Sequence, residues 1–288
     1  ADRAVFTQDG NQRDKGEWSF SIPDAFSRIV LTGTCKNVFD YTANPLGSNV
    51  VTAAWSNGST ALKGYSVTGL TFTAPVVLSA NYYDDYEFLG KNGIPDDATT
   101  GYSEMSGYGK RYSGGCKGQL TGNWTARLTS QLAGSTYSVM YYDDRYRVIQ
   151  RKGNNSLNGM EAVYTSYNFE GSPVKEKRIH SVPGQDIITE VRNHTYDLAN
   201  RLLQTTYQLN DDAPVILVDN VYDEIGRLKT EKRTGHSKLR TDYTYNLRSW
   251  TKGINGPLFH QTLTYQESID GTTPCYNGNI SSMIWKSG

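Results

Sequence analysis

The sequence predicts an all-β fold of stacked β-hairpins, and three observations support this fold class. A seven-residue phrase, clearest at residues 222–228 (YDEIGRL), returns at residues 196–202 and 142–148, with degenerate forms that begin at Tyr167, Tyr245 and Tyr276. Consecutive starts lie about 23 to 31 residues apart, a period typical of repeat proteins. The segments between the phrases are rich in Thr, Tyr and Leu and largely alternate in polarity, as strands do. No segment shows a helical period over three turns, so helix should be minor.

Each phrase has the chemistry of a tight hairpin turn. A type I turn favours Asp or Asn at its first position and Gly at its fourth, which matches residues 223–226 and 168–171. In the copy at residues 196–202, Asn200 stands where Gly is expected, and Asn tolerates a left-handed backbone better than most residues. A type I turn followed by a left-handed residue is a common hairpin connection. The Tyr should therefore end one strand, and the Arg and Leu after the turn should begin the next.

The residues assigned to these turns are given a structural role. They are Tyr142, Asp143, Arg147, Asn168, Gly171, Tyr196, Asp197, Asn200, Arg201, Tyr222, Asp223, Gly226, Arg227 and Leu228. Two copies carry a bulky residue in the fourth position, Tyr146 and Ile280, so their bends are expected to differ in type or to reflect decay of the repeat. Each recurring Arg is expected to pair with an acidic group or to cap the neighbouring hairpin, at under about 1 kcal/mol per exposed pair.

The phrase resembles the YD repeat of RHS (rearrangement hotspot) proteins. The match to Y-D-x-x-G-R-L is complete at Tyr222, close at Tyr196 and Tyr142, and extends over about half of the chain. Residues 24–30 are similar to a further unit, with Pro23 in place of the Tyr. The resemblance implies an extended, curved sheet that is a segment of a hollow RHS shell. In several relatives the shell encloses a C-terminal toxin polypeptide, whereas others are large surface or wall-associated proteins. The resemblance therefore implies a fragment of a larger bacterial protein that is secreted or on the cell surface.

The sequence divides into three parts. Residues 1–43 form an opening segment with one degenerate repeat, residues 44–122 form a β-rich divergent region, and residues 123–288 carry the YD-repeat hairpin array. Within the middle part, residues 90–118 are rich in Gly and polar residues and are predicted to form a long loop. Loops longer than about 12 residues are uncommon unless they have a function or are disordered. Whether residues 44–122 form a separate domain is left open.

Charge and hydropathy exclude several classes of partner. The chain has 29 basic and 29 acidic residues and no basic run, so neither nucleic acid nor an anionic membrane surface is an expected partner. The apolar runs are too short to span a bilayer. The chain begins at Ala1 without a leader, which favours a processed product or a fragment. Cys35, Cys116 and Cys275 are too few and too widely spaced for a disulfide framework or a zinc site, so isolated buried thiols are expected.

No motif for catalysis or metal binding stands out, and the chain is predicted to be non-enzymatic, without metal or cofactor. The four Asp-Asp pairs are interpreted as turn formers, because adjacent strand residues point to opposite faces and rarely act together on a sugar. The four histidines lack zinc spacing, and no G-x-S-x-G motif occurs. The self-cleavage module of many RHS relatives carries an Asp-Pro motif, and the absence of any Asp-Pro pair places that module and any toxin outside this chain.

The aromatic residues leave two functions open. Tyr occurs 21 times and Phe only 8 times, a balance that suits half-wet sheet faces. Tyr243 and Tyr245 are candidates for facing a ligand, because residues i and i+2 share one face of a strand. Cross-strand stacking is the favoured role for such rings. The leading hypothesis is a structural shell segment whose partner is the remainder of the same polypeptide. The alternative is a surface adhesion or carbohydrate-binding module that uses exposed tyrosines on a glycan or a host protein.

Overall fold

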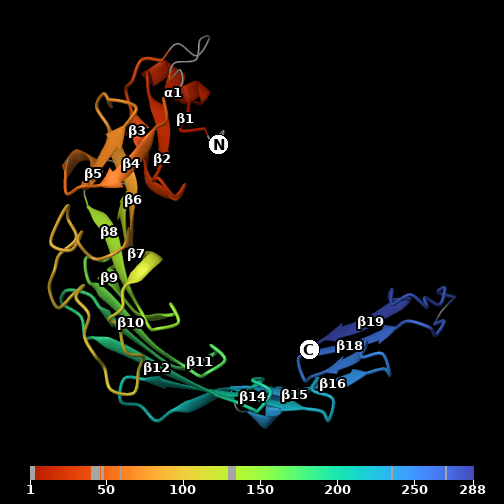
Figure 1. Cartoon of the computed structure of the whole chain (residues 1–288). Coiled ribbons are helices and arrows are strands. Elements are labelled where there is room, and N and C mark those ends of the chain that lie inside the picture. Colours follow the sequence, from red (N-terminus) through yellow and green to blue (C-terminus); the bar gives the residue numbers. More distant parts are fainter. Residues whose placement is uncertain are drawn as a thin grey trace. The chain divides into compact units, whose positions relative to one another are not determined.

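The computed structural model describes most of the chain and divides it into two compact units. The described residues are 4–39, 46, 49–58, 60–128, 134–234, 236–269 and 271–288, without the side chain of Ser237. Unit 1 comprises residues 1–165 and 178–187, and unit 2 comprises residues 166–177 and 188–288. The described residues are 49% strand and 4% helix, which confirms the all-β prediction. Of the nineteen strands found among the described residues, seventeen are assigned to one sheet, and β4 and β5 form a separate hairpin (Figure 1).

Unit 1 contains antiparallel strands that pair mostly in chain order. The pairing runs β1–β2–β3–β6–β7–β8–β9–β10. The elements are β1 (Phe6–Thr7), α1 (Gly10–Lys15), β2 (Trp18–Pro23), β3 (Ile29–Cys35), β4 (Thr52–Trp55), the 3-10 helix η1 (Thr60–Leu62), β5 (Tyr65–Thr68), β6 (Val76–Asp84), β7 (Cys116–Ala126), β8 (Ser135–Tyr142), β9 (Val148–Asn154) and β10 (Met160–Tyr167). The last two residues of β10 belong to unit 2. Helix α1 begins with a capping box, in which the Asp9 side chain and Gln12 satisfy each other's backbone amides.

A buried aromatic cluster forms the core of unit 1. The rings of Tyr82 and Phe88 stack with their centroids 4.4 Å apart, and those of Tyr86 and Tyr141 stack at 4.8 Å. Burial raises the pKa of the Tyr141 hydroxyl to about 12. Phe88 lies in the long connection between β6 and β7, so that connection contributes to the core.

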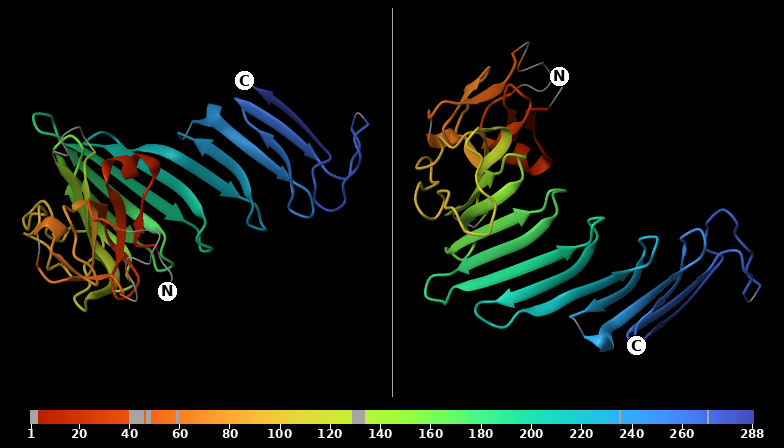
Figure 2. Two further views of the ribbon diagram at one scale, coloured as in Figure 1. Left: turned by 90° about the horizontal axis from the view of Figure 1, so that it is seen from above. Right: turned by 60° about the horizontal axis from the view of Figure 1, so that its bottom comes forward.

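Unit 2 is an array of antiparallel hairpins in which each strand pairs with the next, from β12 to β19 (Figure 2). The elements are β12 (Ile188–Tyr196), β13 (Leu202–Leu209), β14 (Val215–Tyr222), β15 (Leu228–Arg233), the 3-10 helix η2 (Ser237–Leu239), β16 (Arg240–Tyr245), β17 (Thr251–Asn255), β18 (Phe259–Thr264) and β19 (Ser282–Ser287). Strand β11 (Pro173–Ser181) has residues in both units. Among the described residues of unit 2, only Thr205, Thr230, Leu263, Thr264 and Tyr265 are buried. Unit 2 thus depends on strand pairing and turn contacts more than on a deep core.

The structure fixes the form of the repeated turns. In the turn at residues 223–227, the amide of Gly226 donates to the carbonyl of Asp223 and the amide of Asp223 donates to the carbonyl of Arg227, both at 2.9 Å. Gly226 is left-handed, with φ of 88°. The register of β14 and β15 shifts at Tyr222, so the left-handed residue belongs to a β-bulge. The turn at residues 197–201 repeats these bonds, with Asn200 at φ of 58°.

Of the two alternatives expected for the copies with a bulky fourth residue, a different type of bend is wrong for the copy at Tyr146. The bend at residues 143–147 does not differ in type, because Tyr146 itself adopts the left-handed conformation, with φ of 58°. The amide of Tyr146 donates to the carbonyl of Asp143 at 3.1 Å, as in the other turns. The hydrogen bonds of the Asp143 side chain hold the turn and override the conformational preference of Tyr. In the degenerate copy at Tyr276, Gly278 is left-handed in place of Ile280.

The predicted domain boundaries have no test in this structure. The boundary after residue 43 lies outside the described residues, and the one after residue 122 falls within β7. The three-part division stays a prediction.

Replacing Tyr146 with Gly is expected to stabilise unit 1 by about 0.5 kcal/mol. Relief of the left-handed strain gains about 1 kcal/mol, and the greater freedom of Gly in the unfolded chain offsets part of that gain. Urea unfolding at equilibrium measures the change. The control is Asp144→Gly in the same turn, where φ is not positive and Gly should destabilise the protein. Equal destabilisation by both variants would contradict the strain argument.

Candidate functional site: the turn ladder

One aspartate organises each complete turn. The Asp223 carboxylate accepts the backbone amides of Ile225 at 3.1 Å and Arg227 at 2.8 Å through Oδ1, and it accepts Arg227 Nε at 2.7 Å through Oδ2. The same three bonds recur at Asp197, Asp143 and Asp24. The side-chain bond from Arg201 holds the pKa of Asp197 below its ordinary value. The carboxylate therefore closes the turn and fixes the direction of the Arg side chain.

Each fixed Arg in unit 2 lies over an aromatic ring of the next hairpin. The Arg201 guanidinium carbon lies 4.8 Å from the centre of the Tyr222 ring, and that of Arg227 lies 4.7 Å from the Tyr245 ring. A cation over an aromatic face is worth about 0.5 to 1 kcal/mol at exposed sites. Unit 1 has a related contact, in which Arg28 lies 4.3 Å from the Tyr83 ring and also pairs with Asp84. That pairing holds the pKa of Asp84 below its ordinary value.

The tyrosine hydroxyls make the return contact to the preceding hairpin. The hydroxyl of Tyr222 donates to the carbonyl of Leu202 at 3.0 Å, and that of Tyr245 donates to the carbonyl of Leu228 at 2.8 Å. In both cases the acceptor is the residue that directly follows the preceding turn. In the same way, the hydroxyl of Tyr196 donates to the carbonyl of Pro173 and the hydroxyl of Tyr265 donates to the carbonyl of Thr251, both at 2.8 Å.

These contacts join into what we call the turn ladder. In unit 2 it comprises Asn168, Gly171, Ser172, Tyr196, Asp197, Asn200, Arg201, Tyr222, Asp223, Gly226, Arg227, Tyr245, Asn246, Trp250 and Tyr265. Direct links between turns add to it, since Asn168 Nδ2 donates to Asn200 Oδ1 at 2.7 Å and Arg227 Nη1 donates to the Asn246 carbonyl at 3.2 Å. Because neighbouring strands run in opposite directions, every second connection lies at the same end of the strands, and these turns therefore lie in a row along one side of the sheet. Each hairpin is thus braced to its neighbour at the turn as well as along the strands.

The structure places the remaining predicted turn residues in related positions. Tyr142, Asp143 and Arg147 surround the turn between β8 and β9 in unit 1, and the Tyr142 hydroxyl donates to the carbonyl of Leu120 at 2.5 Å. Leu228 is the first residue of β15 and supplies the carbonyl that Tyr245 binds.

Two further turns have the same side-chain bonds although their sequences match the repeated phrase poorly or not at all. In residues 155–159, Asn155 Oδ1 accepts the amides of Leu157 and Gly159, and Asn158 is left-handed with φ of 60°. No Tyr precedes this turn, and an Asn-x-x-Asn-Gly pattern is its only sequence signal. In residues 246–250, Asn246 replaces Asp, and Trp250 replaces the Arg. The Trp250 ring contacts that of Tyr265 at 5.0 Å, so an aromatic pair takes the place of the cation contact.

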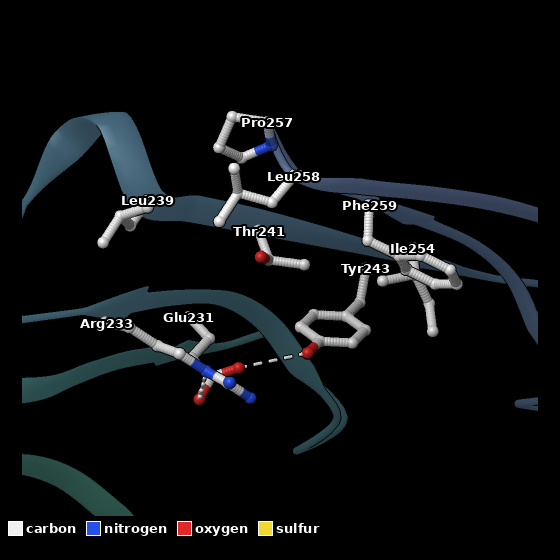
Figure 3. Close-up of a pocket in the computed structure, with 10 residues that line it drawn as sticks. Glu231, Arg233, Leu239, Thr241, Tyr243, Ile254, Pro257, Leu258 and Phe259 are labelled. Carbon is white, nitrogen blue, oxygen red and sulfur yellow. Dashed lines mark hydrogen bonds and ion pairs between the residues drawn. The ribbon is translucent and has the colours of Figure 1, made fainter. Parts of the chain in front are cut away.

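The two tyrosines proposed to face a ligand have different surroundings. Tyr245 belongs to the turn ladder, where Arg227 covers its ring. Tyr243 donates its hydroxyl to Glu231 at 3.2 Å and lines a cleft of about 360 Å³ (Figure 3). Apolar side chains form much of the cleft wall: Leu239, Ile254, Pro257, Leu258 and Phe259. Tyr243 is therefore the better placed of the two to contact a ligand.

In the part of the chain that the structure describes, no three His, Cys, Asp or Glu side chains gather closely enough to hold a metal ion. Cys35, Cys116 and Cys275 are all unpaired, and the first two are buried. No helix within the described ranges has the length and apolar character needed to cross a membrane.

Comparison with known proteins gives only a distant likeness. No family model and no curated protein matches the chain. Among solved structures it is similar to TcdB2-TccC3-Cdc42, with 8% identity, a TM-score of 0.28, and coverage of 94% of this chain and 14% of that chain. It is also similar to TcdB2-TccC3 without the hypervariable C-terminal region, with 9% identity, a TM-score of 0.28, and coverage of 87% and 13%. The chain thus spans a small part of both structures, and a likeness at this level carries no argument about its function.

Proposed function

We propose that this chain is a non-enzymatic structural segment of an RHS/YD-repeat shell. The shell encloses or presents a polypeptide that lies outside this chain in the same protein, such as a C-terminal toxin. The whole protein is secreted or on the surface of a bacterial cell. The observation that carries the proposal is the turn ladder, because the residues that recur in the sequence are the ones that brace successive hairpins.

The physical properties of unit 2 support a role as a wall. A sheet with few buried residues gains little from a hydrophobic core and needs another source of rigidity. The turn ladder supplies it, since each Asp bonds within its own turn, each Arg also contacts the next hairpin, and each Tyr hydroxyl bonds to the preceding hairpin. The Asp and Arg side chains that make these bonds therefore have a structural role. The strand residues between the turns can then vary without loss of the architecture.

Limited proteolysis of the natural polypeptide that contains this segment tests the proposal. The sequence outside the repeats should resist protease in the intact protein and should be cleaved quickly when it is made without the repeats. Arg201→Met combined with Arg227→Met removes two braces and should speed that cleavage at least about fivefold, a change of about 1 kcal/mol in the opening equilibrium. Lys229→Met combined with Lys238→Met is the matched control, because both lysines are exposed and lie outside the ladder.

Equal cleavage rates with and without the repeats would overturn the enclosure proposal. Equal rates for the two double variants would instead show that the turn ladder does not hold the wall closed.

The cleft at Tyr243 favours a second candidate function, a surface adhesion or carbohydrate-binding module. An aromatic ring beside polar groups is a common way to hold a sugar or an apolar side chain. A glycan array tests it with Tyr243→Ala, and Tyr245→Phe serves as the control that keeps the ladder ring. Glycan binding that is lost in Tyr243→Ala but kept in Tyr245→Phe supports this function. No glycan binding by the wild-type chain, or equal binding by Tyr243→Ala, rules this function out.

A further inference from the structure

The chain contains five Asn-Gly pairs, and a pair of this kind is chemically labile. They lie at residues 57–58, 92–93, 158–159, 255–256 and 277–278. Gly has no side chain to hinder its amide nitrogen, so that nitrogen can reach the side-chain carbonyl carbon of the preceding Asn. The structure separates the five pairs by two features: whether the Gly amide is already hydrogen-bonded, and whether the turn around it is held.

In three of the pairs the Gly amide already donates a hydrogen bond. The donors are Gly58, Gly159 and Gly256, and their acceptors are the Gly64 carbonyl at 3.1 Å, Asn155 Oδ1 at 2.9 Å and the Phe259 carbonyl at 2.9 Å, respectively. The nitrogen can attack only after this bond has broken, because its proton must leave and its electron pair must turn toward the Asn side chain. These pairs therefore react only through local opening of the turn.

The pair at Asn92 is held by a tight turn instead. The amide of Gly93 has no hydrogen-bond partner among the described residues. The amide of Ile94, however, donates to the carbonyl of Lys91 at 3.0 Å, and Ile94 is only 1% exposed. Rotation of the Asn92 side chain and main chain into an attacking geometry would disturb this turn and the buried residue after it. Asn92 is therefore restrained by the turn.

The pair at Asn277 has neither restraint. Residues 276–280 are all described, and no main-chain hydrogen bond joins them to one another. The amide of Gly278 has no hydrogen-bond partner in the described part of the chain. Asn277 is exposed, and its Oδ1 accepts the amide of Asn279 at 3.1 Å. A donor at this oxygen stabilises the negative charge that develops there when the carbonyl carbon is attacked, as in an oxyanion hole.

We propose that Asn277 is a site of spontaneous deamidation, with water as the only co-reactant. The Gly278 nitrogen gives its proton to solvent, and its electron pair forms a bond to Cγ of Asn277. The bond from Cγ to Nδ2 breaks, and Nδ2 leaves with the electron pair and takes up a proton as ammonia. Water then opens the resulting succinimide ring. Attack at Cγ gives aspartate, and attack at the main-chain carbonyl carbon gives isoaspartate.

The reaction changes the connection between β18 and β19. Both products replace a neutral amide with a carboxylate, and isoaspartate also lengthens the main chain by a carbon atom at residue 277. The pairing with β18 begins soon after this point, where the amide of Ser281 donates to the Thr264 carbonyl at 2.8 Å. The modified residue therefore lies just before β19, the last strand that the structure describes.

Peptide mapping by mass spectrometry tests the proposal on the intact chain, kept folded at mildly alkaline pH. Asn277 should deamidate at least about fivefold faster than Asn57, Asn158 and Asn255, because a hydrogen bond must first break to free each of their Gly amides. In urea these bonds are lost, and the five pairs should react at similar rates. If Asn277 reacts no faster than the other three in the folded chain, the proposal is overturned.

Asn155→Ala tests whether the bond to the Gly amide controls the reaction. The variant removes the acceptor of the Gly159 amide, while Asn158 Oδ1 still accepts Arg127 Nη1 at 2.7 Å and keeps its carbonyl polarised. Asn158 should then deamidate at least about fivefold faster than in the wild-type chain. Asn57 should keep its slow rate, which shows that unit 1 remains folded. An unchanged rate at Asn158 would overturn the reason for selecting Asn277.

Discussion

Replacing Gly153 with Ala is expected to lower the free energy of unfolding of unit 1 by about 3 kcal/mol. Gly153 lies in β9, opposite Ser138 of β8 and Glu161 of β10. A Cβ atom at this position would lie 2.0 Å from the carbonyl oxygen of Tyr137 and 3.0 Å from the Cα of Ser138. These are backbone atoms of the neighbouring strand, so they cannot rotate away as a side chain would. The added methyl group must therefore push β8 and β9 apart and weaken the pairing between them.

Gly10→Ala is the matched control, because nothing lies within 4 Å of a Cβ built there. Its effect on stability should stay within about 0.5 kcal/mol. Urea unfolding gives both values, and hydrogen exchange of β8 and β9 shows where Gly153→Ala acts. If both variants unfold at the same urea concentration, the close approach of β8 at Gly153 is not a constraint on the fold.

The hairpin turns were predictable because their chemistry is local. Five consecutive residues contain every donor and acceptor of the turn at Asp223, so the spacing of Asp, Gly and Arg predicts it without knowledge of the fold. Tyr146 shows where such a rule fails. Residue preference predicts a different bend there, but the three hydrogen bonds of Asp143 impose the common one. The three hydrogen bonds together contribute more free energy than the conformational preference of Tyr146, which is about 1 kcal/mol.

The contacts between repeats were not predictable in the same way. Whether Arg201 reaches Tyr222 depends on the pairing of β13 with β14 and on the bulge at each turn, which place the two side chains together. The sequence predicts an acidic partner for the repeated Arg, and Asp197 is that partner of Arg201. The contact of Arg201 with the Tyr222 ring is visible only in the structure.

The burial of Lys152 depends on long-range contacts in the same manner, because its Nζ donates to the carbonyls of Ala98 and Gly101 in the connection between β6 and β7. Composition predicts a long loop at residues 90–118, but nothing in it indicates that β9 would bind the loop backbone. A lysine in a strand reads as exposed, and only the carbonyls of the distant loop make its burial tolerable.

Tyr222→Ala is expected to destabilise unit 2 by about 2 kcal/mol. The change removes the hydrogen bond to the Leu202 carbonyl, the ring under Arg201, and the apolar area of a half-buried side chain. Full burial of an aromatic ring would make the loss about 3 to 5 kcal/mol, and partial exposure reduces it. Tyr222→Phe keeps the ring and should lose only about 1 kcal/mol, the typical net value of one hydrogen bond.

Tyr276→Ala is the matched control, because Tyr276 begins a degenerate copy and is 69% exposed. It should change stability by less than about 0.5 kcal/mol. A double-mutant cycle of Tyr222→Leu with Arg201→Met then isolates the contact between hairpins, with an expected coupling of about 0.5 to 1 kcal/mol. Strictly additive effects would mean that the repeated Arg and Tyr stabilise only their own turns. Measurable coupling would mean that each repeat stabilises the next, which is what a wall of stacked hairpins with little core requires.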